Sequence, residues 1–375
     1  AEKVFVNKIL GYNTITKTWF NADVIPRSHA YTSAIKIDDK IIIPGGEIES
    51  GKTSRRVWKV NPLQKSKTFG WINSGTMLIY LLLMVGVGIF FSFRNKNTDD
   101  YFRGGQRIPW WAAGLSIFAT ILSSLTFIAI PAKAYATDWV QSVVNLGILL
   151  VAPFLIYFIL PFFRKIDATS AYEYLEQRFS VFVRLLASAT FVFFQIGRMA
   201  IVMFLPSLAL ATITPLSVEN CILVMGVLSI LYCTLGGLEA VIWTDAIQSV
   251  ILLGGALLSF ALIIANLDGG FSEFYTVASA QQKFHIANWE WDVASVTRSA
   301  FWVVLLGGVA QQMVPGASDQ AVIQRYMSVN SESKARKAIW TNAVVSMPAT
   351  LIFFALGTAL FVFYKSNPSS LDPTF

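Results

Sequence analysis

The amino-acid sequence predicts an all-α polytopic membrane protein that is preceded by a short β segment. Of its 375 residues, 55% are hydrophobic and only 14% are charged, which is typical of a membrane protein. Long apolar runs begin at Trp71, whereas residues 1–67 alternate short apolar stretches with turn residues. The chain therefore divides into a β segment at 1–67 and a membrane domain at 68–375.

Eight apolar stretches are long enough to cross the hydrocarbon core of a bilayer, which needs about 20 residues of helix. They cover 71–93, 110–135, 139–162, 181–211, 218–235, 241–266, 297–316 and 338–364. The seventh contains Gly307, Gly308 and Pro315, so we expect it to be broken rather than straight.

The second span, Trp110–Tyr135, is not a plain anchor. It carries no charge before Lys133, yet its centre holds small and hydroxyl side chains, and Pro131 removes a backbone donor near its end. In lipid, such a loosened helix centre is tolerated where it packs on protein or lines a watery cavity. Helix packing through small residues is the alternative reading.

The charged loops indicate the orientation. Basic residues follow the first, third and seventh spans: Arg94, Lys96, Arg103, Arg107, Arg164, Lys165, Arg178, Arg184, Arg325, Lys334, Arg336 and Lys337. By the positive-inside rule these loops are cytoplasmic, so the β segment lies outside, which is the periplasm in a bacterium. The same rule accounts for the net charge of +7, and no nucleic-acid partner is inferred.

The β segment reads as short strands bounded by turns. Gly45-Gly46 and Glu49-Ser50-Gly51 are expected to separate strands, and the pattern resembles one blade of a kelch β-propeller. One blade cannot bury its own faces, so such an element needs further blades upstream.

Arg198 is the most informative single residue because it lies near the middle of the fourth span. An arginine there costs roughly 2.5–3.5 kcal/mol on insertion scales, so it needs a partner. That partner is either an acid on another span or an anionic ligand, since a guanidinium fork suits a carboxylate.

Four further polar residues lie in or beside the apolar spans. Asp245 is either an interfacial charge or a cation ligand, and Asp319 is expected to pair with Arg325. Asn145 and Gln141 either line a cavity or bond neighbouring helices.

Other site types find little support in the sequence. There is no phosphate-binding loop, and Cys221, Cys233, His29 and His285 suggest neither a disulfide framework nor a transition-metal site. The sequence therefore supports a transport function better than a catalytic one.

Three blocks resemble the sodium:solute symporter family, and within it the bacterial sodium-coupled sialic acid transporters. They are DDYFRGGQRIPWWAAGLSIFATILSSLTFIAIPAKAYATDW, YCTLGGLEAVIWTDAIQSV and VPGASDQAVIQRYM, in that order. The resemblance implies a LeuT-type inverted-repeat fold with an extra helix in front. It also implies that this chain is a fragment at both ends, with an incomplete second repeat.

The resemblance implies a site for a small-molecule solute and for Na⁺ as coupling ion. Backbone carbonyls of Ala119 and Leu122 would bind sodium, and Asp245 would match the acid of a second sodium site. The substrate positions would be Ser123, Thr126, Asn145 and Arg198, the last holding a carboxylate. Asn145 stands where these transporters have a glutamine, and Ile121 where a hydroxyl residue is expected.

The stretch PGGEIESGKTSRRVW resembles a blade of periplasmic N-acetylneuraminate mutarotases. Glu47 would match their catalytic glutamate, while Thr53 stands where those enzymes carry an arginine. The resulting expectation is a sialic acid symporter in a bacterial inner membrane, fused to a mutarotase remnant, with no protein partner implied.

The sequence also allows three other functions. The first is a symporter for another solute, such as a sugar, proline or another carboxylate. The second is a membrane-tethered mutarotase enzyme, and the third is a sensor built on a symporter-like module.

Overall fold

The computed structural model describes most of the chain. The residues described are 7–13, 18–27, 30, 32–37, 40–60, 69–122, 124–166, 171–289 and 300–368. The chain divides into two compact units, one formed by residues 1–66, 263–277 and 359–375, and the other by 67–262 and 278–358.

The first unit contains the strands. A two-stranded antiparallel sheet pairs β1 (Lys8–Asn13) with β2 (Thr18–Val24), and a three-stranded antiparallel sheet has the order β3 (Ile35–Ile37), β4 (Lys40–Glu49) and β5 (Lys52–Val60). The predicted turn at Ser50-Gly51 joins β4 to β5.

The prediction that Gly45-Gly46 separates two strands is wrong. Strand β4 runs through both glycines, and the pairing register with β5 shifts between Pro44 and Gly46. Gly45 has φ +51°, and a Cβ there would meet the Ser54 carbonyl oxygen at 2.8 Å. Glycine therefore makes a bulge inside one strand instead of a turn between two.

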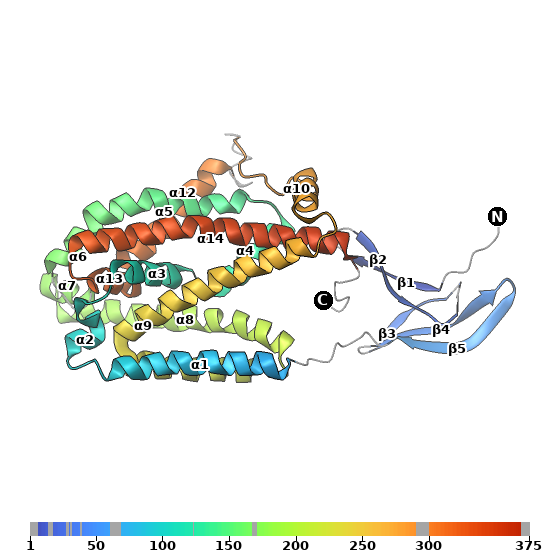
Figure 1. Cartoon of the computed structure of the whole chain (residues 1–375), viewed down its shortest axis with the longest axis horizontal. Helices are drawn as coiled ribbons and strands as arrows, with labels where there is room; N and C mark the ends of the chain where they lie inside the picture. Colours follow the sequence, from blue (N-terminus) through green and yellow to red (C-terminus); the bar gives the residue numbers. More distant parts are fainter. Residues whose placement is uncertain are drawn as a thin grey trace. The chain divides into compact units, whose positions relative to one another are not determined.

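The other regular elements of the described chain are helices (Figure 1). Those of the amino-terminal half are α1 (Trp71–Ser92), α2 (Thr98–Arg103), η1 (Gly104–Gln106), α3 (Trp110–Ile121), α4 (Ser124–Ala136), η2 (Val140–Ser142), α5 (Val143–Phe154), the π-helical η3 (Leu155–Ile159), α6 (Leu160–Ile166), α7 (Ala171–Arg178) and α8 (Val181–Ile213). They are followed by α9 (Val218–Ala265), α10 (Gly270–Ala280), α12 (Phe301–Ser318), α13 (Gln320–Met327) and α14 (Glu332–Ser366).

Five helices in the described residues are long and apolar enough to cross a membrane, or six if the bent pair α3 and α4 counts as one span. These five are α1, the run Val140–Lys165, α8, α9 and α14. The protein is therefore a polytopic α-helical membrane protein, as the composition predicts.

Helix α9 accounts for two predicted spans. Its 48 residues would extend for about 70 Å as a straight rod, more than twice the bilayer core. Gly237 has φ 61° and ψ −161°, a non-helical conformation that divides α9 into two arms. These arms correspond to the predicted spans 218–235 and 241–266.

The expected break inside the seventh span is absent from α12. This helix continues from Phe301 to Ser318 with Pro315 inside it, and the chain turns only at Asp319, which has an extended conformation. The glycine expected to loosen α12 instead serves packing. A Cβ on Gly308 would meet the Val144 carbonyl oxygen at 2.3 Å, and one on Gly147 would meet the Gly308 carbonyl carbon at 2.5 Å.

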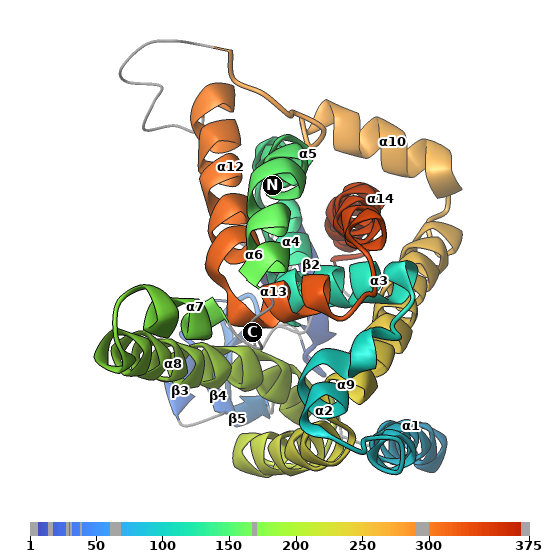
Figure 2. The same ribbon diagram turned by 90° about the vertical axis from the view of Figure 1, so that its left-hand side faces the viewer.

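This close approach places α5 and α12 side by side, as two views show (Figures 1 and 2). Small residues allow helix backbones in a membrane to come close enough for extensive van der Waals contact. The prediction that α12 would break there was wrong because a glycine pair reads the same in sequence whether it loosens a helix or packs it.

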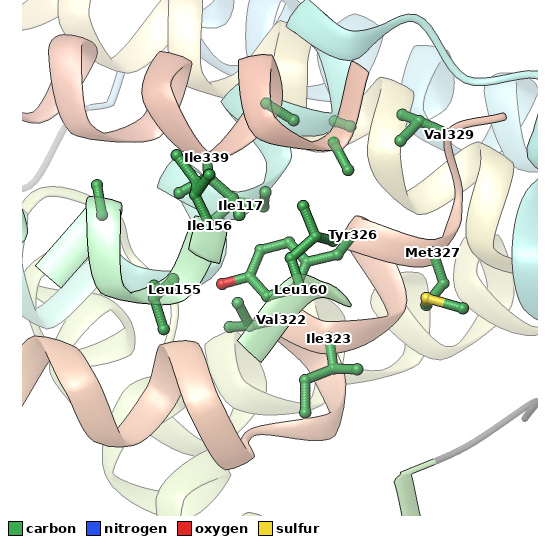
Figure 3. Close-up of a cluster of buried hydrophobic side chains, with 14 of the residues drawn as sticks. Ile117, Leu155, Ile156, Leu160, Val322, Ile323, Tyr326, Met327, Val329 and Ile339 are labelled. Carbon is green, nitrogen blue, oxygen red and sulfur yellow. The ribbon is translucent and has the colours of Figure 1, made fainter. Parts of the chain in front are cut away.

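The second unit has a buried core that joins helices far apart in sequence. Its members lie on α3, α5, η3, α6, α9, α13 and α14 and in the loops beside α3 and α14. Figure 3 shows the side chains around Tyr326, a fully buried residue whose hydroxyl donates to the Gly316 carbonyl oxygen at 3.2 Å. The core thus fixes the short helix α13 against α3, where the polar side chains of the site gather.

Candidate functional site

The centre of the predicted second span is broken. Helices α3 and α4 are inclined by 60° to one another, and Leu122 at the end of α3 has an extended conformation with φ −80° and ψ 98°. The carbonyl groups in the last turn of a helix have no partner within it. Of the two expected sodium ligands, Ala119 lies in this last turn and Leu122 is the residue directly after it.

The two expected hydroxyl positions follow the break. Thr126 is a half-buried residue in the first turn of α4. Ser123 lies outside the described residues. The structure thus brings Ala119, Leu122 and Thr126 to the two sides of one helix break.

Arg198 reaches this break from α8. Its Nη2 donates a hydrogen bond of 3.2 Å to the carbonyl oxygen of Thr120, in the last turn of α3. Its Nη1 lies 3.3 Å from the Asp319 carboxylate, so the acid on another span that the sequence allowed is Asp319. A guanidinium has five N–H donors, and these two bonds leave it capacity for another acceptor.

Asp245 takes part in a second polar cluster, one turn earlier on α3. Its Oδ2 accepts hydrogen bonds from the Ser116 hydroxyl at 2.6 Å and from Arg325 Nη2 at 2.8 Å. The Nε of Arg325 also donates to the Ser116 hydroxyl at 2.6 Å. Three helices, α3, α9 and α13, therefore meet at one buried ion pair.

The expected pairing of Asp319 with Arg325 is wrong. Asp319 pairs with Arg198, while Arg325 pairs with Asp245. The cause is the short helix α13. Asp319 stands before its first turn, where its Oδ1 accepts a hydrogen bond from the Ala321 N–H, and Arg325 extends from its last turn to a different partner.

The two clusters are joined through the last turn of α3. The Thr120 hydroxyl donates to the Ser116 carbonyl oxygen at 2.7 Å, and each of these residues contacts one of the two arginines. Near them on α7 is Tyr172, whose pKa is raised by burial and further by the negative charge of Asp319.

Other expected site residues lie elsewhere in the fold. Asn145 is a half-buried residue on α5, which packs against α12, and Gln141 is an exposed residue in η2. In the first unit, the Glu47 carboxylate accepts a hydrogen bond from the Gly51 N–H, and Glu47 is paired with Thr53 across the β4–β5 ladder. Glu47 therefore closes the turn between these strands.

Sequence reasoning missed Ser116 and the roles of Asp319 and Arg325. One signal for Ser116 was present, because it precedes Thr120 by one helical turn and so lies on the same face of α3. For Asp319 the signal was an acid directly before a helix, which is a preferred N-cap residue.

The comparison with models of protein families identifies the family of this chain. Residues 101–372 match the model of the sodium:solute symporter family. This chain belongs to the sodium:solute symporter family.

Curated relatives agree with this assignment. A sodium/sialic acid symporter of Proteus mirabilis is 45% identical over 308 residues, which cover 82% of this chain and 62% of that protein. One of Aliivibrio fischeri is 41% identical, covering 83% of this chain and 61% of the relative. The human sodium/iodide cotransporter is 30% identical. The chain thus spans about three fifths of the length of the two bacterial symporters.

A solved structure is similar to most of the chain. It is a substrate-bound, outward-open Na⁺-coupled sialic acid symporter, with a TM-score of 0.76 and 43% sequence identity, covering 82% of this chain and 65% of that one. The similarity confirms the predicted fold class, a LeuT-type helical membrane protein with a small β segment at the amino-terminal end.

Proposed function

We propose that this protein couples the inward flow of sodium to the uptake of a sialic acid, such as N-acetylneuraminate, across the cytoplasmic membrane of a bacterium. The observation that carries this proposal is the position of Arg198. Its guanidinium lies at the break between α3 and α4, within 3.2 Å of the Thr120 carbonyl oxygen. A fixed positive charge at a broken membrane helix is suited to an acidic sugar.

The solute would be held by charge and by hydroxyl groups. Arg198 would bind the carboxylate through its planar fork of donors. Ser123 and Thr126 would bond the polar groups of the sugar from the start of α4, and the Asn145 amide would contact the solute from α5. The 41% and 45% identity to sodium/sialic acid symporters supports this choice of solute.

Sodium would bind where α3 ends. Carbonyl oxygens are suitable ligands for a hard cation, and Ala119 and Leu122 have theirs at the end of α3. The Asp245 carboxylate is the candidate acid of a second site, because the hydrogen bonds from Ser116 and Arg325 both fall on Oδ2 and a cation would approach through Oδ1. Bound sodium would hold the break in the shape that presents Thr126 to the solute.

The orientation proposal follows from how three basic loops contact one another. Arg107 pairs with Val329 in an isolated β-bridge, and Arg164 Nη2 donates to the Val329 carbonyl oxygen at 2.6 Å. Gln324 donates to the Phe102 carbonyl oxygen at 3.2 Å. The loops after the first, third and seventh spans thus share one side, which we assign to the cytoplasm by the positive-inside rule. The β segment would then be periplasmic.

We further propose that residues 1–67 derive from a sialic acid mutarotase of the kelch type. The motif around Glu47 supports this origin, and a periplasmic mutarotase would supply the preferred anomer to the symporter beside it. Such a segment adds an enzyme-derived part to a transporter, while the membrane domain itself performs transport and not catalysis.

The test is sodium-dependent solute binding to the purified protein. Isothermal titration would compare N-acetylneuraminate, proline, lactate and glucose, each in sodium and in potassium buffer. We expect N-acetylneuraminate to bind in sodium and to lose most of its affinity in potassium. Sodium-dependent binding of one of the other three solutes, without binding of N-acetylneuraminate, would contradict the proposed substrate and leave the symporter class intact.

A further inference from the structure

We propose that Asp319 is an internal competitor of the solute: its carboxylate occupies Arg198 when no solute is bound, and an anionic solute must displace it. This inference rests on the proposed role of Arg198 in binding a carboxylate. It assigns to Asp319 a role in setting the affinity and the charge selectivity for the solute. It also connects solute binding to the contact between α8 and α13.

Asp319 contacts Arg198 in the way that a bound solute would. Arg198 Nη1 lies 3.3 Å from Asp319 Oδ2, the same kind of contact that a bound carboxylate would make. The Arg198 side chain is 33% exposed, whereas that of Asp319 is 11% exposed. Arg198 is therefore the more accessible member of the pair.

Asp319 keeps a hydrogen-bond partner after displacement. Its Oδ1 accepts the hydrogen bond from the Ala321 N–H at 2.8 Å, so only Oδ2 is released when Arg198 turns to the solute. The amino-terminal end of α13 also favours a negative charge there. When the solute displaces Asp319, Arg198 exchanges one carboxylate partner for another. The Asp319 carboxylate keeps its hydrogen bond to the amino-terminal end of α13.

The Arg198–Asp319 pair also links helices. The buried core joins α3, α5, α6, α9, α13 and α14, and Arg198 adds two polar contacts from α8 to this group, to Thr120 and to Asp319. When the solute replaces Asp319, Arg198 would hold the solute and α3, and the direct link from α8 to α13 would open. Solute binding would therefore release one cross-link between α8 and the junction of α12 and α13.

The decisive variant is Asp319→Asn. Asparagine is as good an N-cap as aspartate, so α13 keeps its first-turn hydrogen bond while the competing charge is removed. Because the solute no longer has to displace a charge-assisted bond, we expect the Kd of N-acetylneuraminate in sodium buffer to fall by about tenfold or more. Asp138→Asn is the matched control, because that acid pairs with His285 instead of Arg198 and should leave the Kd unchanged.

A neutral ligand separates competition from a general structural effect. The methyl ester of N-acetylneuraminate has no charge to offer Arg198, so Asp319→Asn should not tighten its binding. If the variant tightens the acid and the ester equally, or leaves the Kd of the acid unchanged or raises it while the melting temperature is preserved, the inference is wrong and the proposed function stands.

The same titrations distinguish the two proposals. If the unaltered protein binds lactate or proline in place of N-acetylneuraminate, the proposed substrate fails, and the comparison with Asp319→Asn is made with that carboxylate. If neither protein binds any of these carboxylates, both the proposed role of Arg198 and the inference fail.

Discussion

Arg325 and Asp245, 80 residues apart in sequence, form an ion pair with 2.8 Å between Nη2 and Oδ2. The side chains are 7% and 17% exposed, and the Ser116 hydroxyl lies between them. The pair fastens α13 to α9 and, through Ser116, to α3 one turn before the break. It therefore shapes the region where sodium and solute are proposed to bind.

Removing one member of this pair should destabilise the fold more than removing both. Arg325→Met leaves Asp245 without its counter-charge, at a cost of about 3 kcal/mol or more, whereas the double variant Asp245→Asn with Arg325→Met leaves no unpaired charge. Melting temperatures in detergent should show the double variant as less destabilised than Arg325→Met alone.

A surface pair supplies the control for that cycle. Arg336 pairs with Glu332, and both side chains are more than 40% exposed, so Arg336→Met should cost less than about 1 kcal/mol. If the losses of stability caused by Asp245→Asn and Arg325→Met simply add in the double variant, the two buried residues are not energetically coupled and the prediction is contradicted.

Replacement of Arg198 by lysine tests whether the guanidinium fork matters beyond its charge. Lysine keeps the charge but offers a single ammonium, so it cannot hold a carboxylate in the bidentate manner. We expect the Arg198→Lys variant to bind N-acetylneuraminate about tenfold more weakly or worse. Arg184→Lys on the same helix, where Arg184 pairs with Glu176, should bind it normally.

Two neighbouring glycines on α12 make a matched test of helix packing. A Cβ on Gly308 would meet the Val144 carbonyl oxygen at 2.3 Å, whereas one on Gly307 would meet nothing within 4 Å. Gly308→Ala should therefore separate α5 from α12 and lower stability by about 1–3 kcal/mol. Gly307→Ala should be neutral or slightly stabilising in the same thermal melts, and equal effects of the two changes would contradict the packing seen here.

Local features of the fold were predictable because they depend on neighbouring residues. Apolar length located α1, α8 and α14, and the hydroxyl-rich centre of Trp110–Tyr135 indicated the break between α3 and α4. The turn between β4 and β5 was likewise readable from Ser50-Gly51. In each case the determining signal lies within about one span of sequence.

Features that depend on distant contacts were predicted less well. Gly308 looked like a helix breaker because its packing partner, Val144, is far away in sequence. Arg325 looked like the partner of Asp319 because the two lie six residues apart, yet each extends from a different end of α13 to another helix. Arg198 was recognisable as a charge that needs a partner, although only the folded chain identifies Asp319 in that role.

The measurement that tests the central claim most directly is uptake of labelled N-acetylneuraminate into proteoliposomes containing the purified protein. An inward sodium gradient should drive accumulation, a potassium gradient should not, and Arg198→Ala should abolish uptake while Arg184→Lys retains it. Accumulation that is independent of sodium, or that persists unchanged in the Arg198→Ala variant, would contradict the account.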